Sequence, residues 1–521
     1  MADDHGDPGG HYLGGQKMLM QEIHWSTQSD LPLLALLQLL PLLAMAILLL
    51  IRKRDRLLFP VAMIAALIEL WLAFELYQTL DHGVTAFQLA ERLQLLGPLA
   101  YHAAVDGVGV LFVIFTALLT LLVVLYGEVR TFPPKGLFLV TVFAVQAALI
   151  SSVVTVDLLW FVVVTALQLL PVSYLLHKWS TSPAKDEAVM RFVQFMASGL
   201  LLLFAGTLML GWNYADANNG EWSFNLYALA AQPLAAATQS IIFFLLFYGM
   251  AVRVPLFPLH GWLPKIAEHG SVAVAPVFLI GLKTGIYGIF RFVLPLLPEA
   301  VMQWHIYIIA FAVAGVFYAA LLALTQSNLR RLLAFAVISH SGILIIGLFS
   351  LSKLAFQGAL ILSINFGLAG AGLLFMTGMV FRRTRTALLH QLGGLFETIP
   401  LIGITFFVAG LSIVGMPGTP GFDAAHLILE ASMHRYGALV TIAAALGNVV
   451  AAGFLLWAFQ RAFLAAKPEG MREIERVNRA EVVLASTILF CLLGAGFYSE
   501  PLLELVDMSL VNLGEFYARV H

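Results

Sequence analysis

The segment PLFPLHGWLPKIAEHGSVAVAPVFLIGLKTGIYGIFRFVLPLLP, residues 255–298, holds the features that decide the fold of this chain. Its second half is an apolar run with one lysine, Lys283, near the middle. Its first half contains Pro255, Pro258 and Pro264, which interrupt the hydrogen-bond ladder of a helix. Such a break is tolerated at membrane depth where the freed backbone lines a cavity. The segment therefore predicts a broken membrane span followed by a second span with an ionisable group inside it.

Apolar runs of this kind recur along the whole chain of 521 residues. Hydrophobic residues make up 60% of the sequence and charged residues 11%, whereas a soluble domain has about 25% charged residues. The runs are continuous rather than alternating, which predicts helices and not a barrel. We expect an all-α integral membrane protein of about fourteen transmembrane helices, since a span needs about 20 residues. The expected spans are 31–51, 57–79, 106–127, 136–155, 158–177, 191–212, 235–256, 271–296, 305–325, 332–351, 355–381, 398–430, 437–465 and 481–505.

A second interruption lies in GMPGTPGF, residues 415–422, five spans after the first. The two breaks fall in spans 7 and 12, and each leads into a histidine, His260 and His426. Broken helices at corresponding places indicate transporter halves related by an internal repeat. The sequence therefore predicts two repeated halves with broken helices 7 and 12.

Basic residues are concentrated in alternate loops. The loops after odd-numbered spans carry nearly all of them, as in RKRDR (52–56), HKWSTSPAKDEAVMR (177–191) and FRRTR (381–385). The intervening loops hold about four, which we take to be Arg92, Arg291, Lys353 and Arg435. Cytoplasmic loops carry the excess of lysine and arginine, so both termini are expected on the non-cytoplasmic side. The first thirty residues are polar and begin acidic, unlike a signal peptide.

Composition and motifs exclude several classes of protein. The formal net charge is −2, which offers no basic field for nucleic acid. The single cysteine, Cys491, excludes an internal disulfide and a cysteine-ligated iron–sulfur cluster. GLAGAG at 367–372 lies inside an apolar run with no strand before it, so it indicates helix packing rather than nucleotide binding. We expect no cofactor and no metal.

Two basic residues, Arg253 and Lys283, lie well inside apolar spans. An ionisable group there costs about 2.5 kcal/mol or more, which makes each a functional candidate. A buried lysine whose pKa is lowered can lose and regain a proton near neutral pH. Arginine keeps its proton and can only hold charge and orient water. The alternative is that each side chain pairs with a neighbouring helix or reaches the membrane surface.

His340 lies inside another span, between Ser339 and Ser341. It is either a hydrogen-bonded packing residue or a proton-binding group on a hydrated path. Two of the acidic candidates, Asp106 and Asp157, stand at span ends, where a helix cap is the alternative. The accessory candidates are Glu69, Asp106, Asp157, His260, Asp423, His426 and Glu430.

Residues 255–298 resemble the proton-translocating antiporter-like subunits of respiratory complex I, specifically the M type, which are related to Mrp-type antiporter subunits. Further matches are VDGVGVLFVIFTALLTLLVVLY (105–126), SNLRRLLAFAVISHSG (327–342), VGMPGTPGF (414–422) and LLWAFQRAF (455–463). The resemblance implies two inverted five-helix repeats, spans 4–8 and 9–13, in a bacterial-type inner membrane. The chain then divides into a polar N-terminal tail (1–30), N-terminal helices 1–3 (31–127), a first antiporter-like repeat (136–296), a second (305–465), and a C-terminal helix and tail (481–521).

The resemblance also implies roles for single residues. Lys283 matches the relay lysine of span 8 and His340 the histidine of span 10, while Arg253 stands where the family has a lysine. The family's span-5 glutamate should fall near Thr165 or Ala166, and its span-12 acid near Ala425, and all three residues are neutral. Asp423 and Glu430 are offset from the second position by two and five residues. Either a different acid, such as Glu69 or one on a neighbouring subunit, faces Arg253, or the first half-channel does not pump protons.

The expected function is that of a proton-translocating membrane subunit of a complex I-like NADH-quinone oxidoreductase assembly. Its partners would be other membrane subunits, the lipid bilayer and protons, and the redox chemistry would belong to other subunits. Two alternatives keep the fold. One is the proton channel of a complex that takes up a substrate such as inorganic carbon, and the other is a non-conducting scaffold.

Overall fold

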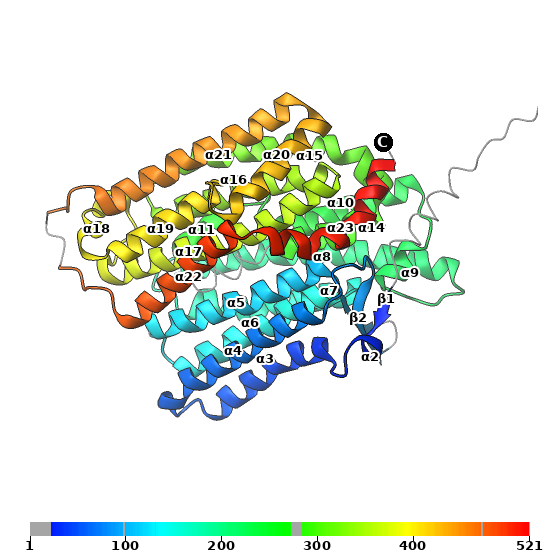
Figure 1. Cartoon of the computed structure of the whole chain (residues 1–521), viewed down its shortest axis with the longest axis horizontal. Helices are drawn as coiled ribbons and strands as arrows, with labels where there is room; N and C mark the ends of the chain where they lie inside the picture. The colour runs from blue at the N-terminus through cyan, green and yellow to red at the C-terminus, as the bar shows by residue number, and fades with distance from the viewer. Residues whose placement is uncertain (1–21, 97–98, 131, 272–283, 470–472, 520–521) are drawn as a thin grey trace, which may run out of the picture.

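The computed structural model describes residues 22–96, 99–130, 132–271, 284–469 and 473–519. Long helices lie side by side with a small sheet at one end of the bundle (Figure 1). In the described ranges, twelve helices are long and apolar enough to cross a membrane, and the apolar helices Thr284–Leu296 and Pro400–Ile413 are shorter. The all-α integral membrane architecture is therefore confirmed. The count of fourteen spans and the division into two inverted repeats stay predictions.

The first half of the chain contains seven of the long helices. Its helices are α3 (Leu33–Leu50), α4 (Asp55–Thr79), α5 (Gly107–Val129), α6 (Lys135–Val154), α7 (Leu158–Lys178), α8 (Lys185–Ala217), α9 (Leu226–Ala230), α10 (Ala236–Arg253) and α11 (Leu263–His269). They are followed by α13 (Thr284–Gly288), the π-helical turn η1 (Ile289–Val293) and α14 (Leu294–Leu296).

The second half begins with a long helix that follows α14 directly. Its helices are α15 (Pro298–Leu324), α16 (Leu329–Phe349), α17 (Lys353–Thr384), η2 (Leu389–Gln391), α18 (Leu395–Thr398), α19 (Pro400–Ile413), α20 (Pro420–Tyr436), α21 (Ala438–Phe459), η3 (Gln460–Leu464), α22 (Arg479–Phe497) and α23 (Glu500–Arg519).

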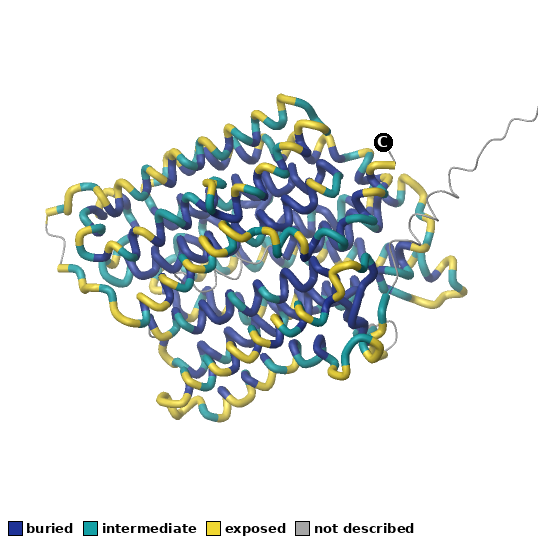
Figure 2. Tube along the Cα trace, viewed as in Figure 1, coloured by how far each residue is buried: buried dark blue, intermediate teal, exposed yellow. Residues whose placement is uncertain are grey.

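The helices separate into an inner and an outer set. Of the most apolar stretch of α16 and of α17, 94% is buried, against 28% for α21 and for α22. Figure 2 shows the same division, with dark blue along the inner helices and yellow on the outer helices and loops. A helix that is apolar on all sides is stable only when protein or lipid surrounds it. The exposed apolar faces of the outer helices are therefore suited to lipid or to neighbouring membrane subunits.

Both predicted interruptions are present. Helix α10 ends at Arg253 and the chain resumes as α11 at Leu263, while α19 ends at Ile413 and α20 begins at Pro420. In the second break Gly415 and Gly418 have φ angles of 74° and 84°, which glycine adopts without steric cost. Both breaks are partly exposed, and several of their backbone N–H groups form turn hydrogen bonds, such as Leu256 to the Ala251 carbonyl and Met416 to the Leu411 carbonyl.

A three-stranded sheet was not expected from the sequence. It consists of β1 (Glu22–His24), β2 (Phe87–Leu96) and β3 (Leu99–Val105), in the order β1-β2-β3. Strand β1 pairs in parallel with β2, and β2 pairs with β3 in antiparallel register, with Glu91 opposite Ala103. Strand β1 and the short helix α2 (Trp25–Gln28) belong to the segment predicted as a polar tail. The pairing of β1 with β2 joins distant parts of the chain and leaves no local pattern, whereas β2 and β3 are consecutive strands that were missed.

The C-terminal segment predicted as a tail is the helix α23. It packs against α5 and α17 at the same end of the molecule as the sheet. The Gly107 N–H donates to the Ser509 hydroxyl at 2.8 Å, and the Tyr517 hydroxyl donates to the Leu294 carbonyl at 2.7 Å. We call this end, with β1–β3 and α23, the sheet end. The opposite end, with the loops 51–54, 179–184 and 385–394, is called the basic end.

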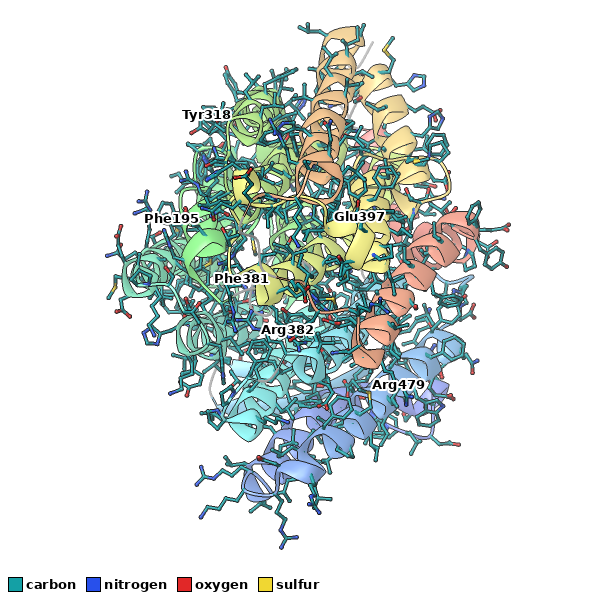
Figure 3. All side chains as sticks on the ribbon, turned by 90° about the vertical axis from the view of Figure 1, so that its left-hand side faces the viewer. Phe195, Tyr318, Phe381, Arg382, Glu397 and Arg479 are labelled. Atoms are coloured by element: carbon teal, nitrogen blue, oxygen red, sulfur yellow. The ribbon has the colours of Figure 1, made fainter. Side chains whose placement is uncertain are left out.

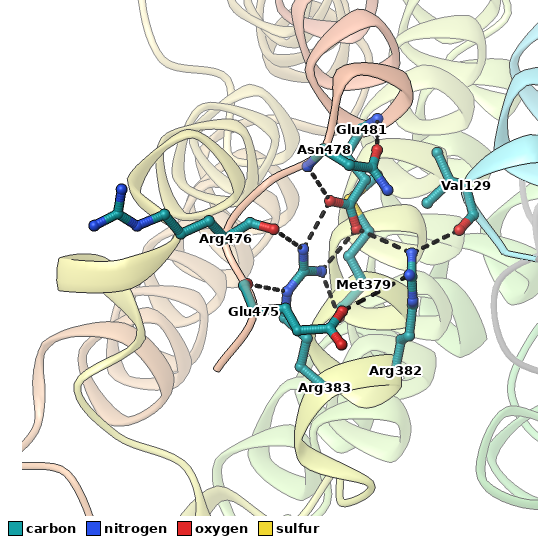
Figure 4. A network of polar contacts seen from close by, with 8 residues as sticks. All are labelled: Val129, Met379, Arg382, Arg383, Glu475, Arg476, Asn478 and Glu481. Carbon is teal, nitrogen blue, oxygen red and sulfur yellow. Dashed lines mark hydrogen bonds and ion pairs between the residues drawn. The ribbon is translucent and has the colours of Figure 1, made fainter. Parts of the chain in front are cut away.

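Figure 3 views the molecule from the basic end, and Figure 4 shows a network of ion pairs and hydrogen bonds there that joins distant parts of the chain. Arg383 makes two 2.7 Å bonds to the Glu481 carboxylate, and both side chains are almost fully buried. Arg382 donates to the Val129 carbonyl at 2.7 Å. Glu481 also accepts the Asn478 N–H and so completes the N-terminal cap of α22. Arg382 and Arg383 lie in the last turn of α17 and not, as predicted, in a loop.

Arg291 also differs from the prediction of a loop residue. It lies in η1, and its two terminal nitrogens bond the Asp106 carboxylate at 2.8 and 2.6 Å. The Phe87 ring of β2 lies 4.7 Å below the guanidinium, and the Tyr287 hydroxyl is 3.1 Å from its Nε. Asp106 in addition accepts the Gly109 N–H at 2.8 Å, as its helix-cap alternative predicts. One buried ion pair thus joins α5, η1 and the sheet.

We predict that Arg291→Met destabilises the folded protein by about 3–5 kcal/mol, because it leaves the Asp106 carboxylate buried without its cation. The measurement is denaturation of the purified protein in detergent. The double variant Arg291→Met/Asp106→Asn should recover much of the loss, since no unpaired charge then remains.

The matched control is Arg519→Met, whose partner Glu515 is exposed at a helix surface. That pair should contribute little because water screens it. An Arg291→Met variant as stable as Arg519→Met would contradict the role of the buried pair.

Candidate functional site

The candidate site lies where α10 is interrupted. The Arg253 side chain at the end of α10 donates from Nη2 to Oε1 of Gln168 on α7 at 2.7 Å. The same nitrogen is 3.4 Å from the hydroxyl of Thr284 on α13. Its Nε atom is buried and has no hydrogen-bond partner among the described residues. Arginine keeps its proton, so a full positive charge is held here by neutral groups.

Two further polar side chains are buried on α6 and α7, the second of which also holds Gln168. Thr165 lies one turn before Gln168 on α7, and Gln146 lies on α6, which packs against α7. In the described part of the chain, neither the Thr165 hydroxyl nor the Gln146 amide has a hydrogen-bond partner. Leaving a buried polar group unpaired costs free energy, and ordered water is the usual partner in such places. Water bound to the Thr165 hydroxyl would lie one helical turn from Gln168, the partner of the half-buried Arg253.

Lys283, the predicted proton carrier, lies outside the described residues. The residue after it, Thr284, is the one that contacts Arg253. Gly285 packs so closely on Met250 and Val254 of α10 that a side chain there would meet backbone and side-chain atoms. The helix that follows Lys283 is thus fixed against the arginine. The role of Lys283 stays a prediction.

His340 is buried in α16, with its Nδ1 2.7 Å from the Ala336 carbonyl and its ring edge against Phe366. The neighbouring serines donate to backbone carbonyls, Ser339 to Val316 and Ser341 to Val337. The serines were expected to mark a hydrated path, but their hydroxyl donors are used within the protein. The role of His340 in proton transfer stays a prediction.

Polar side chains that the sequence did not single out lie close to the second interrupted helix. The Ser412 hydroxyl on α19 donates to Oδ1 of Asn365 on α17 at 2.6 Å, and Asn365 Nδ2 donates to the Ser412 carbonyl at 3.0 Å. Asn365 itself was the sequence signal that could have found this pair, because an asparagine in an apolar span needs hydrogen-bond partners when it is buried. Gln168, which bonds Arg253, was also missed. An acid was expected near Thr165 or Ala166, and Gln168 lies about one turn further along the helix.

Glu69 does not face Arg253. Both of its carboxylate oxygens are buried and have no hydrogen-bond partner among the described residues. It lies on α4, which packs against α3, α5 and α6, whereas the hydrogen bonds of Arg253 go to α7 and α13. The proposed pairing of Glu69 with Arg253 is therefore wrong.

The remaining accessory candidates lie apart from Arg253. Asp157 caps α7 through the Trp160 N–H at 2.8 Å, and Asp106 pairs with Arg291. His260, in the break after α10, packs against the rings of Phe257 and Tyr318. Asp423 accepts the Ser499 hydroxyl, and His426 and Glu430 are exposed on α20. The structure thus brings together Arg253 and Gln168, and separately Asp106 and Arg291, but it does not bring the accessory set into one cluster.

A helical membrane bundle with two interrupted helices and a cation at one of the breaks belongs to the class of integral membrane subunits with a transporter-like fold. Residues 155–451 match the family model described as NADH:quinone oxidoreductase/Mrp antiporter, transmembrane. The chain therefore belongs to this family, as the resemblance of residues 255–298 predicted.

Several known proteins are similar over nearly the whole chain. NADH-quinone oxidoreductase subunit M of Escherichia coli is 30% identical over 470 residues, which cover 87% of this chain and 91% of that protein. NADH-ubiquinone oxidoreductase chain 4 of Marchantia polymorpha is 28% identical and covers 91% of this chain and 95% of its own length.

Two solved structures have the same fold. A chain of respiratory complex I from Thermus thermophilus superposes with a TM-score of 0.81 at 26% identity, covering 92% of this chain and all of that one. A chain of the Mrp complex from Dietzia sp. has a TM-score of 0.80 at 19% identity, over 94% and 99% of the two chains.

We predict that Gln168→Leu destabilises the protein by about 1.5–3 kcal/mol, the range for a hydrogen bond to a charged group. The double variant Arg253→Met/Gln168→Leu should lose less than the sum of the two single losses, because the residues act as a pair. Denaturation of the three variants in detergent tests this.

Gln357→Leu is the matched control. Its buried amide donates to the neutral carbonyl of Leu503 at 3.0 Å. This hydrogen bond should contribute about 1 kcal/mol to the free energy of unfolding. Strict additivity of the Arg253 and Gln168 variants would contradict the pairing.

Proposed function

We propose that this chain is the proton-translocating membrane subunit of a complex I-like NADH-quinone oxidoreductase assembly. The carrying observation is the Arg253 cation at a broken helix, held by the neutral groups of Gln168 and Thr284, together with buried polar atoms on α6 and α7 that have no partner among the described residues. Such a site is stable only when water or another polar group completes it. Water in contact with a fixed cation and a titratable neighbour is what a proton path requires.

In this proposal Lys283 is the group that changes its protonation state. A fixed positive charge nearby favours the neutral amine, so Arg253 would help Lys283 to release its proton. His340 would take the proton in the second half of the chain, since histidine exchanges protons near neutral pH. Gln168 replaces a carboxylate as the partner of Arg253, so it holds the arginine in place without neutralising it.

The partners would be other membrane subunits, through the exposed apolar faces of the outer helices. The relatives support this, because the E. coli protein is a subunit of NADH-quinone oxidoreductase and the Thermus chain is part of complex I. The redox chemistry would belong to those partners. By the distribution of basic residues, the basic end faces the cytoplasm and the sheet end the opposite side, with both termini there.

We predict that Lys283→Ala lowers the number of protons moved per electron by the assembly, while the subunit remains assembled and the redox reaction continues. The protons that move through this chain should all be lost, because alanine cannot bind a proton, and those moved by other subunits should remain. The measurement is acidification of the vesicle lumen during redox turnover of the reconstituted assembly.

Lys353→Ala is the control, because this lysine forms a partly exposed ion pair with Asp507 at the sheet end. It should move protons like the native chain. Native proton movement in the double variant Lys283→Ala/His340→Ala would contradict the proposal and favour a scaffold of the same fold.

A further inference from the structure

A polar cavity of about 210 Å³ lies at the sheet end, away from Arg253. Strands β2 and β3, the start of α7 and the residues before α9 line it. Since one water occupies about 30 Å³ in the liquid, the cavity has room for several water molecules. Its polar lining includes Arg92, Tyr101, His102, Asp157 and Asn225. A cavity of this kind is suited to water rather than to an apolar ligand.

The cavity joins an exposed rim to buried ionisable groups. Arg92, Leu93 and Trp222 on its rim are exposed. His102 and Asp157 on its inner wall are each only 2% exposed. Water that enters past the rim therefore reaches two side chains that can bind and release protons.

His102 is held by contacts on both ring nitrogens. Its Nε2 is 2.9 Å from the Glu22 carboxylate and 3.0 Å from Nε of Arg92, and its Nδ1 faces the Asn225 amide. Burial opposes the charge of Glu22, but the bond from His102 and the charge of Arg92 hold the pKa of this carboxyl below its usual range. A carboxylate and a histidine in contact form a pair that can take up a proton.

Asp157 stands between the cavity and the interior of the bundle. It caps α7 through the Trp160 N–H, and its backbone pairs with Asn225 of the cavity wall. Burial raises the pKa of the Asp157 carboxyl to about 6, so protonation near neutral pH is within reach. The neighbouring Asp106 is already paired with Arg291. Helix α7 then leads inward to Thr165 and Gln168, about 12 and 16 Å further along its axis.

We propose that this cavity is a proton-exchange port, at which Asp157 and His102 pass protons between the water at the sheet end and the interior beside α7. The inference rests on the proposed function, because a port is useful only to a chain that moves protons. The step is a proton transfer alone. The O–H bond of the Asp157 carboxyl breaks as a cavity water takes the proton, and that water passes a proton to His102 or to the bulk. The reverse sequence takes a proton up.

The test uses the complete assembly in vesicles and compares Asp157→Asn and His102→Gln with Lys283→Ala. Asparagine caps helices as well as aspartate does, so Asp157→Asn removes the titratable group and keeps α7. We expect each port variant to lower the number of protons moved per electron by as much as Lys283→Ala lowers it. Added acetate should restore proton movement in Asp157→Asn, and imidazole should restore it in His102→Gln, because small acids can replace a missing proton carrier. Neither should restore Lys283→Ala.

The matched controls are Asp81→Asn and His82→Gln, the same changes in exposed residues of the loop after α4 at the sheet end. They should leave proton movement unchanged. Port variants that pump like these controls would overturn the port, and so would a loss in either port variant that no small acid restores. Native proton movement in Lys283→Ala would instead overturn the proposed function, and the port with it.

Discussion

The cost of placing charge where lipid cannot solvate it controls this structure. Most of the buried cations are stabilised by a hydrogen-bonding or ionic partner in the same chain. Arg291 bonds both oxygens of Asp106, and Arg383 bonds both oxygens of Glu481. These pairs lie toward the ends of the bundle, where they join helices that are far apart in the sequence. Removing one member would leave a buried charge, so each pair holds its helices in one arrangement.

Arg253 is not paired with a carboxylate among the described residues, and the proposed function rests on this difference. Among the described residues its partners are the amide of Gln168 and the hydroxyl of Thr284, which orient the positive charge and do not neutralise it. It stands where prolines end α10, close to Thr165, whose hydroxyl lacks a partner among the described residues. A cation that neutral groups orient at a break in a helix can bind water there. That water is the physical basis of the proposed proton path.

Local patterns in the sequence were sufficient to predict the helices and the two interruptions, because span length, proline and glycine act on neighbouring residues. The family was predicted from the resemblance of residues 255–298. The cost of burial alone directed attention to Arg253. The partners could not be predicted, since Asp106 and Arg291 are 185 positions apart and Gln168 is a neutral residue in an apolar run. Strand β1 was missed for the same reason, because its pairing with β2 joins Glu22 to Phe87 across two membrane spans. Contacts between distant residues carry no periodic signal.

The most direct test of the central claim is a density map of the native assembly that resolves ordered water. The account predicts water bound to Arg253 Nε, to the Thr165 hydroxyl and to the Gln146 amide, with further water in the cavity beside Asp157. Side chains or lipid packed against these atoms, with no water within hydrogen-bonding distance, would contradict it. In that case the chain would be a scaffold that keeps the fold of a transporter.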